Sequence, residues 1–126
     1  MQCTPSTLRG LFHHAGTAEA AGSLRKILLG GEALPVDLAR RVHDTLPAAE
    51  LFNMYGPTET AVWSATWPVR ELEGSLPIGR PIANTRLYVV DRSGSPVPAG
   101  TPGELGTPRV RAPEPAFTSR ESAWPW

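Results

Sequence analysis

The apolar positions in the first half of the chain follow a helical period in two segments. Leu8 and Phe12 share one face of a helix predicted over residues 4–12, where Pro5 suits the first turn. In residues 33–45, apolar side chains recur at every fourth position, which predicts a second amphipathic helix. Between these segments, residues 17–23 are small and polar and predict a loop.

Two short apolar runs, residues 24–29 and 50–54, flank the second predicted helix and indicate strands. A glycine pair, Gly30-Gly31, ends the first of them. Strand, glycine-rich turn, helix and strand make one right-handed crossover unit, in which the two strands are parallel and buried. The first half of the chain therefore predicts an α/β fold.

After Pro57 the pattern changes to that of short strands. Residues 61–67 could form one strand, and residues 85–91 carry the clearest strand pattern in the chain. Residues 92–95 read as a turn, and residues 97–105 as the return limb of a hairpin interrupted by proline. The second half is thus expected to be rich in β-structure.

Composition narrows the classes of function. Lys and Arg total 12, as do Asp and Glu, and this balance argues against a basic nucleic-acid surface or a polybasic membrane patch. No apolar run approaches the ~20 residues of a membrane span, and from this sequence we expect neither a membrane span nor a secretory leader. The single cysteine, Cys3, excludes an internal disulfide and a multi-cysteine metal cage. We expect a cytoplasmic protein without a nucleic-acid or membrane partner.

The candidate chemistry lies in the segment NMYGPTET, residues 53–60, at the carboxyl end of the second predicted strand. Ligands of open α/β sheets bind at that end. Tyr55 offers a flat ring for a base, Thr58 a hydroxyl for a phosphate oxygen, and Glu59 a carboxylate for Mg²⁺. From these residues alone, a plain helix entry capped by Thr58 is an open alternative.

Four blocks in a fixed order carry a resemblance: LRKILLGGEALP, NMYGPTET, SLPIGRPIANTRLYVVD and PVPAGTPGEL. They resemble the adenylate-forming enzymes of the AMP-dependent synthetase and ligase superfamily, in particular the adenylation domains of nonribosomal peptide synthetases. The resemblance implies a fragment of the large N-terminal domain. Its fold would be one βαβ unit of a mostly parallel sheet, then a β-rich, barrel-like segment and a disordered tail.

This family activates a carboxylic acid with ATP and Mg²⁺ to an acyl-adenylate. In the synthetases, the acid is an amino acid, and it passes to the phosphopantetheine thiol of a carrier domain that works beside a condensation domain. The resemblance therefore implies ATP and Mg²⁺ as cofactors, and an amino acid together with carrier and condensation domains as partners.

The resemblance also implies roles for individual residues. Asn53 would hydrogen-bond the adenine amino edge, Tyr55 would stack on the ring, Thr58 would contact the α-phosphate, and Glu59 would hold Mg²⁺. Thr58 and Glu59 would form the catalytic pair. The full nucleotide-binding set is Gly31, Glu32, Ala33, Asn53, Tyr55, Gly56 and Thr58.

A further set of positions would line the amino-acid pocket: Gln2, Leu28, Gly30, Met54, Val62 and Trp63. Leu28, Met54 and Trp63 are bulky, and no member of the set offers a charge to a substrate side chain. The combination indicates glycine, with alanine or threonine as runners-up. The alternative for Trp63 is an ordinary place in the core.

Several catalytic parts of the family are not found in this sequence: the phosphate loop with its lysine, the aspartates for the substrate amine and the ribose, and the lysine of the small C-terminal domain. Lys26 cannot replace that lysine, because it opens a predicted strand. We expect residues 1–105 to be a partial adenylation domain, inactive alone, and residues 106–126 a divergent tail, disordered or read out of frame. The alternatives are a fragment of an acyl or aryl ligase, and a non-catalytic remnant or interaction piece.

Overall fold

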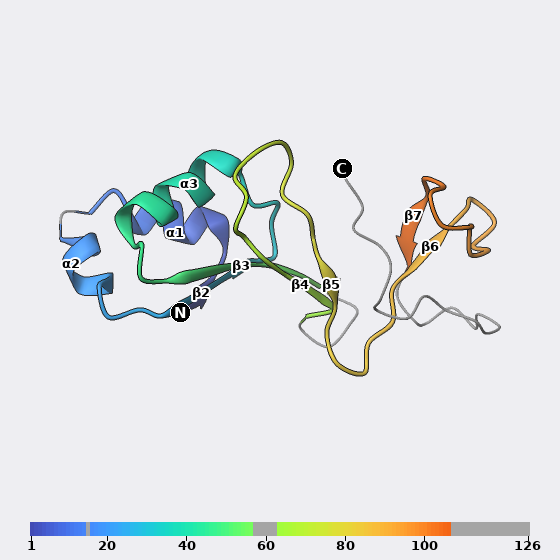
Figure 1. Cartoon of the computed structure of the whole chain (residues 1–126), viewed down its shortest axis with the longest axis horizontal. Coiled ribbons are helices and arrows are strands. Elements are labelled where there is room, and N and C mark those ends of the chain that lie inside the picture. Colours follow the sequence, from blue (N-terminus) through green and yellow to red (C-terminus); the bar gives the residue numbers. More distant parts are fainter. Residues whose placement is uncertain (15, 57–62, 107–126) are drawn as a thin grey trace.

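The computed structural model describes residues 1–14, 16–56 and 63–106 of the chain (Figure 1). Among these described residues, helices and strands are mixed in the first half, and only strands follow β3 (Glu50–Tyr55). In chain order the elements are β1 (Gln2–Cys3), α1 (Pro5–Leu11), α2 (Thr17–Ala21), β2 (Lys26–Gly30), α3 (Val36–Thr45), β3 (Glu50–Tyr55), β4 (Ala65–Pro68), β5 (Arg80–Pro81), β6 (Tyr88–Val90) and β7 (Glu104–Gly106).

The main sheet is mixed, with the strand order β1-β2-β3-β4-β5. Strands β1, β2 and β3 are parallel, whereas β4 and β5 run antiparallel to their neighbours. The predicted crossover of β2, α3 and β3 is confirmed, and so is the α/β class. Strands β6 and β7 form a separate antiparallel pair, at the far end of the molecule from α1 and α3 (Figure 1).

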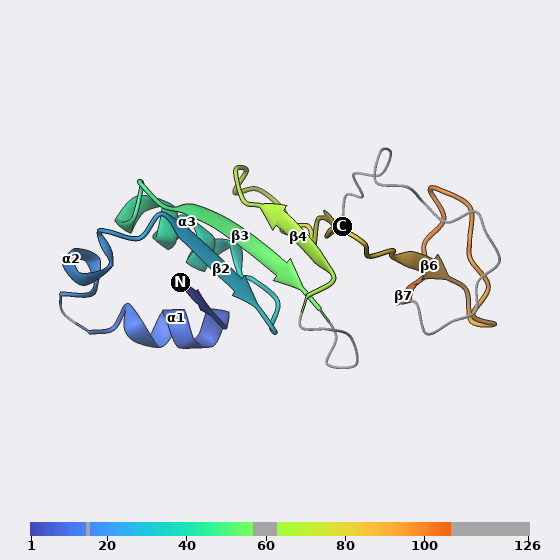
Figure 2. The same ribbon diagram turned by 90° about the horizontal axis from the view of Figure 1, so that it is seen from below.

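One face of the main sheet carries the hydrophobic core. Helices α1 and α3 lie on this face, and Figure 2, seen from below, shows β2 and β3 in front of α3. Because side chains alternate along a strand, Ile27, Leu29 and Leu51 point toward the helices, and all three are buried. The helices contribute the other large members of the cluster: Leu8, Phe12, Leu38, Val42 and Leu46.

Polar contacts hold the two helices to each other above the sheet. The Arg9 guanidinium donates to both carboxylate oxygens of Asp37, at 3.3 and 3.0 Å. Arg41 donates to the carbonyl oxygen of Phe12 at 2.8 Å, and its guanidinium lies 4.9 Å from the centre of the Phe12 ring. These contacts orient α1 against α3, while burial of the apolar faces supplies most of the stabilisation.

The helix predicted over residues 4–12 is confirmed, and its cap is Thr4, whose side-chain oxygen accepts from the backbone N–H of Thr7. The second helix begins later than predicted, at Val36. Pro35 has extended backbone angles and stands at the N-cap, so residues 33–35 belong to the preceding loop.

The loop predicted over residues 17–23 is wrong, because Thr17–Ala21 form the short helix α2. Gly16, with φ of 84°, precedes the helix, and the backbone N–H of Gly22 bonds to the carbonyl of Glu19 at its end. Three of these residues are alanine, which has the highest helix propensity. The small alanine side chains of this segment therefore favoured a helix and not a loop.

The strands of the second half are shorter than predicted. Only residues 65–68 of the next segment form β4, and the predicted residues 61–62 lie outside the described ranges. Of residues 85–91, only 88–90 form a strand, since the N–H of Thr85 closes a turn onto the Ile82 carbonyl. The predicted return limb contacts β6 at its start, where the N–H of Val97 bonds to the Val89 carbonyl at 2.9 Å, and forms a strand only over residues 104–106. The prolines between these points have no N–H to donate.

The turn at residues 92–95 is confirmed. One carboxylate oxygen of Asp91 accepts from the backbone N–H groups of Ser93 and Ser95 and from the Ser93 hydroxyl. Gly94 supplies the positive φ, 80°, that the turn requires. No helix in the described part of the chain is long and apolar enough to cross a membrane.

The core gives a direct prediction for stability. Ile27→Val removes one methylene group from a side chain that is fully buried between the sheet and the helices. The free energy of unfolding should fall by about 0.5–1.5 kcal/mol in a urea titration. Leu11→Ala is the control, because Leu11 is 40% exposed and its truncation should change this free energy by roughly 0.5 kcal/mol or less. An equal loss in both variants would contradict this placement of the core.

Candidate functional site

The residues predicted for nucleotide binding gather at one edge of the main sheet. Strand β2 ends at Gly30 and β3 at Tyr55, and parallel strands present their carboxyl ends at the same edge. Strand β4 begins at this edge because it runs antiparallel, and the N–H of Ser64 bonds to the Tyr55 carbonyl at 2.7 Å. The loop of Gly31, Glu32 and Ala33 therefore starts beside the end of β3.

The side chain of Asn53 is held in one orientation. Asn53 is 6% exposed, and its amide nitrogen donates to the carbonyl oxygen of Pro77 at 2.8 Å. A carbonyl oxygen can only accept, so this bond assigns the nitrogen to the Pro77 side and the oxygen to the other side. The amide can then accept a hydrogen bond from an amino group, as the predicted contact with adenine requires.

The carboxylate of Glu32 is hydrogen-bonded to Ser6 in helix α1. One oxygen accepts from the Ser6 hydroxyl at 2.6 Å and from the Ser6 N–H at 3.1 Å. The Ser6 hydroxyl is the chief cause that lowers the pKa of Glu32 below its ordinary value of 4.5. Gly31, at φ of 82°, makes the sharp turn out of β2.

Most of the predicted pocket residues lie on the helix-free face of the sheet. Gln2 is opposite Leu28 in the β1–β2 register, and Gly30 is opposite Met54 in the β2–β3 register. Since these positions alternate with those that point toward the helices, they share the other face. Trp63 joins them there, whereas the remaining predicted pocket position, Val62, lies outside the described residues.

Trp63 packs directly against the backbone of β2. A β-carbon added at Gly30 would overlap ring carbons of the Trp63 indole and would lie 2.7 Å from the carbonyl oxygen of Met54. Only glycine at position 30 lets the ring lie there. Trp63 is half-buried and on the face opposite the core, so the alternative of an ordinary core position does not describe it.

The predicted catalytic pair, Thr58 and Glu59, lies outside the described residues, so the phosphate and Mg²⁺ roles stay predictions. Among the residues that the structure does describe, no group of three or more His, Cys, Asp or Glu side chains could hold a metal ion. The described groups at the sheet edge fit an adenine nucleotide: an oriented amide at Asn53, a half-buried ring at Tyr55 and a glycine turn at Gly31.

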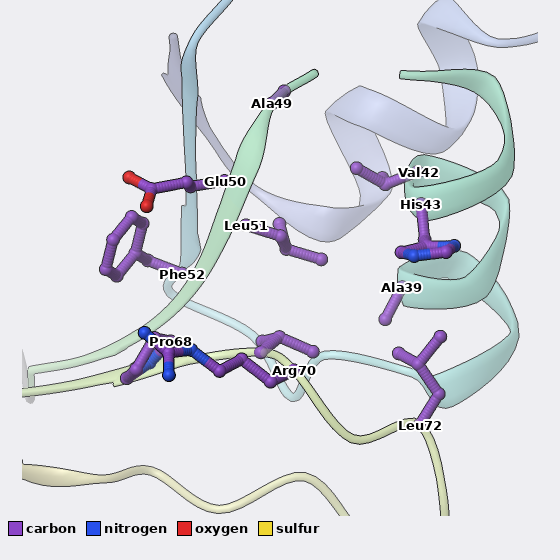
Figure 3. Close-up of a pocket in the computed structure, with 11 residues that line it drawn as sticks. Ala39, Val42, His43, Ala49, Glu50, Leu51, Phe52, Pro68, Arg70 and Leu72 are labelled. Atoms are coloured by element: carbon purple, nitrogen blue, oxygen red, sulfur yellow. The ribbon is translucent and has the colours of Figure 1, made fainter. Parts of the chain in front are cut away.

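A cavity of about 240 Å³ lies elsewhere, between α3, the start of β3 and the segment after β4 (Figure 3). Figure 3 shows Val42, Leu51 and Leu72 pointing into it from separate elements. This cavity is at the amino end of β3, beside Ala49 and Glu50, and so at the opposite edge from the residues predicted for nucleotide binding. Its lining is mainly apolar, and it adds nothing to the chemistry of the candidate site.

Sequence reasoning missed two residues that shape this site. Ser6 holds Glu32, and the carbonyl of Pro77 holds Asn53. Both contacts join segments far apart in the chain, which no periodicity reveals. The block SLPIGRP, singled out in the sequence, was the available signal for Pro77.

Comparisons with known proteins show which families and structures this chain resembles. The sequence profile described as "AMP-binding enzyme" matches residues 1–108. The phosphinothricin tripeptide synthetase PhsB of Streptomyces viridochromogenes is 46% identical over 110 residues, which are 85% of this chain and 9% of that protein. A dimodular nonribosomal peptide synthase of Bacillus subtilis is 45% identical over 108 residues, 83% of this chain and 4% of that protein. The chain therefore spans a small part of the length of these curated relatives.

Solved structures show the same likeness. PA1221, a nonribosomal peptide synthetase protein containing adenylation and PCP domains, superposes with a TM-score of 0.72 at 31% identity, covering 82% of this chain and 21% of that chain. The four-domain synthetase AB3403, solved with AMP and glycine bound, gives a TM-score of 0.69 at 39% identity, covering 82% of this chain and 8% of that chain.

The Glu32–Ser6 contact gives a prediction for pH dependence. Because the folded-state pKa of Glu32 is lowered, its contribution to stability is fully present above the ordinary pKa of 4.5 and is lost as the pH falls through the lower folded value. In Ser6→Ala the pKa of Glu32, followed by NMR of the carboxyl carbon, should rise toward 4.5. Ser93→Ala serves as the control, since the Ser93 hydroxyl donates to the carboxylate of Asp91 and not to that of Glu32. An unchanged Glu32 pKa in Ser6→Ala would refute this cause.

Proposed function

Because this chain belongs to the AMP-binding enzyme family, as a fragment of an adenylation domain of a nonribosomal peptide synthetase, we propose that it forms part of a domain that activates glycine. In this reaction a glycine carboxylate oxygen attacks the α-phosphorus of ATP, and the bond from that phosphorus to the oxygen bridging to the β-phosphate breaks. Pyrophosphate leaves, and glycyl-adenylate remains. A carrier thiol then attacks the carbonyl carbon, and AMP leaves.

The residues of this chain would bind and orient the two substrates. The Asn53 amide oxygen would accept from the adenine amino group, and Tyr55 would stack on the ring beside the backbone of Gly31. Such fixed contacts supply positioning, which lowers the entropic part of the barrier. Thr58 would donate to an α-phosphate oxygen, and Glu59 would hold Mg²⁺, which when bound offsets the negative charge at the phosphates.

The contact between Trp63 and Gly30 is the observation that carries the choice of glycine. Ring carbons of the indole occupy the space into which a side chain at position 30 would project, with Met54 opposite Gly30 on the same face. An indole presents ~200 Å² of contact surface, so a pocket that ends at this ring has little room beyond the α-carbon of a substrate. No charged residue is among the predicted pocket positions, which disfavours acidic and basic amino acids.

Similarity to AB3403, solved with AMP and glycine bound, supports the same choice. The alternative of an acyl or aryl ligase is not favoured, since the curated relatives named above are peptide synthetases. By analogy with PA1221, which contains a PCP domain beside its adenylation domain, we propose a carrier domain as the acyl acceptor, and a condensation domain as the next partner.

A hybrid enzyme tests the proposed function. Residues 1–105 would replace the matching segment of the PA1221 adenylation domain, and amino-acid-dependent exchange of pyrophosphate into ATP would be measured. Relative to unmodified PA1221, the hybrid should shift its preference toward glycine. A folded hybrid that prefers a large or charged amino acid would overturn the choice of glycine, and one that is inactive with every amino acid would favour a non-catalytic remnant.

Trp63→Ala in this hybrid should enlarge the amino-acid pocket. We expect the kcat/KM of leucine relative to glycine to rise about 10-fold or more, the scale on which a hydrophobic pocket discriminates by size. Trp67→Ala is the matched control: Trp67 is opposite Asn53 in the β3–β4 register and so points to the helix side of the sheet. An equal change in both variants would show that Trp63 does not limit the pocket.

Glu59→Gln in the same hybrid tests the predicted metal ligand. Turnover should fall by ~100-fold or more, because the amide cannot supply the charge that a carboxylate offers to Mg²⁺. Glu73→Gln, at an exposed position after β4, should leave turnover unchanged. Equal turnover of the two variants across a Mg²⁺ titration would remove Glu59 from the site.

A further inference from the structure

The hydrogen bond between Asn53 and Pro77 joins the candidate nucleotide site to residues 76–79, which have no role in the proposed function. Asn53 is one of two buried polar residues among the described part of the chain, and its amide nitrogen donates to Pro77 at 2.8 Å. A buried amide without a partner would cost about 1–3 kcal/mol, so the Pro77 carbonyl is a requirement of this position.

Packing against β4 determines where the Pro77 carbonyl lies. Gly79 has φ of 85°, and a β-carbon there would overlap the Thr66 carbonyl group and lie 2.7 Å from the Trp67 β-carbon. Directly after Gly79, strand β5 pairs with β4, and the N–H of Ile82 bonds to the Ser64 carbonyl at 3.1 Å. Residues 76–79 therefore pack closely against β4, and the Pro77 carbonyl lies beside the Asn53 side chain.

We propose that Pro77 and Gly79 are positioning residues, which orient the Asn53 amide so that the site selects ATP over nucleotides with a 6-oxo base. This inference rests on the proposed function, in which Asn53 meets the adenine. Pro77 acts through its carbonyl oxygen, and Gly79 acts by permitting the close approach to β4 that places this oxygen.

The selection follows from hydrogen-bond chemistry. Adenine presents a 6-amino group, which donates, whereas hypoxanthine presents a 6-oxo group, which accepts. An asparagine amide could serve either base by turning over, since its two ends exchange donor for acceptor. Turning over would bring the Asn53 oxygen against the Pro77 oxygen, leaving two acceptors face to face and a buried group unpaired. Pro77 therefore restricts Asn53 to the orientation that accepts.

Glycine variants test this inference in the PA1221 hybrid. Gly79→Ala adds a β-carbon that must displace residues 76–79 from β4, and the preference for ATP over inosine triphosphate in kcat/KM should fall by about 10-fold. The KM for glycine should not change. Gly94→Ala is the matched control: Gly94 has φ of 80°, close to that of Gly79, but its β-carbon would meet nothing within 4 Å. The control carries the same backbone strain and should keep the nucleotide preference.

Pro77→Gly gives a second variant that introduces no clash. It keeps the carbonyl but removes the ring that fixes φ, so the preference for ATP should fall by about 3-fold. An unchanged preference in folded Gly79→Ala, or in Pro77→Gly if Gly79→Ala does not fold, overturns the inference. A parent hybrid that is active but accepts both nucleotides equally also overturns it. A parent hybrid without activity refutes the proposed function, and the role in nucleotide selection with it.

An NMR measurement on the 126-residue chain tests the bond between Asn53 and Pro77 without an activity assay. Donation to Pro77 protects one side-chain amide proton of Asn53 from exchange with water. By NMR, Gly79→Ala should make this proton exchange about 10-fold faster or more, while Gly94→Ala should not change it. Equal exchange in the two variants would show that Gly79 does not hold Pro77 in place.

Discussion

The register of β2 on β3 is the constraint on which the rest of this structure depends. It places Ile27 beside Leu51 under the two helices, and by strict alternation it places Gly30 beside Met54 on the opposite face. A shift of one residue would exchange the two faces of β3. Leu51 would leave the core, and Asn53 would lose the Pro77 carbonyl. One strand pairing thus decides both how the chain buries its apolar surface and which residues meet at the candidate site.

Two glycines show how close packing, and not flexibility, shapes the site. Gly30 admits the indole of Trp63, and Gly79 admits the backbone of β4, because neither position has room for a β-carbon. Gly94 differs, since it needs a positive φ but has open space around it. A substitution at Gly30 or Gly79 therefore moves a neighbouring element, whereas one at Gly94 strains only its own turn. The amino-acid pocket and the base contact that we propose each depend on one of the first two.

Hydrogen bonds from segments distant in the chain orient side chains near the carboxyl ends of β2 and β3. The carboxylate of Glu32 is held by Ser6 at the start of α1, and the amide of Asn53 by Pro77 ahead of β5. Each of these bonds adds little to the total stability, because the buried cluster between helices and sheet dominates it. Their effect is on orientation: they determine which atoms the loop after β2 and the end of β3 present to a ligand.

The sequence by itself determined the elements whose signals are local. The face shared by Leu8 and Phe12 was sufficient to predict α1, and the apolar runs of β2 and β3, with the handedness of crossovers, were sufficient to predict the parallel unit. The motif at residues 53–60 predicted a candidate site at the end of a strand. Strands β1 and β5, of two residues each, are too short to carry a period, and they exist only because a neighbouring strand offers its backbone groups. The same holds for the contacts of Trp63 with Gly30 and of Asn53 with Pro77, since they join residues that only the folded sheet brings together. Local propensity acts over a few neighbours in the chain, whereas register and close packing depend on the whole fold, and these were decided by the tertiary structure alone.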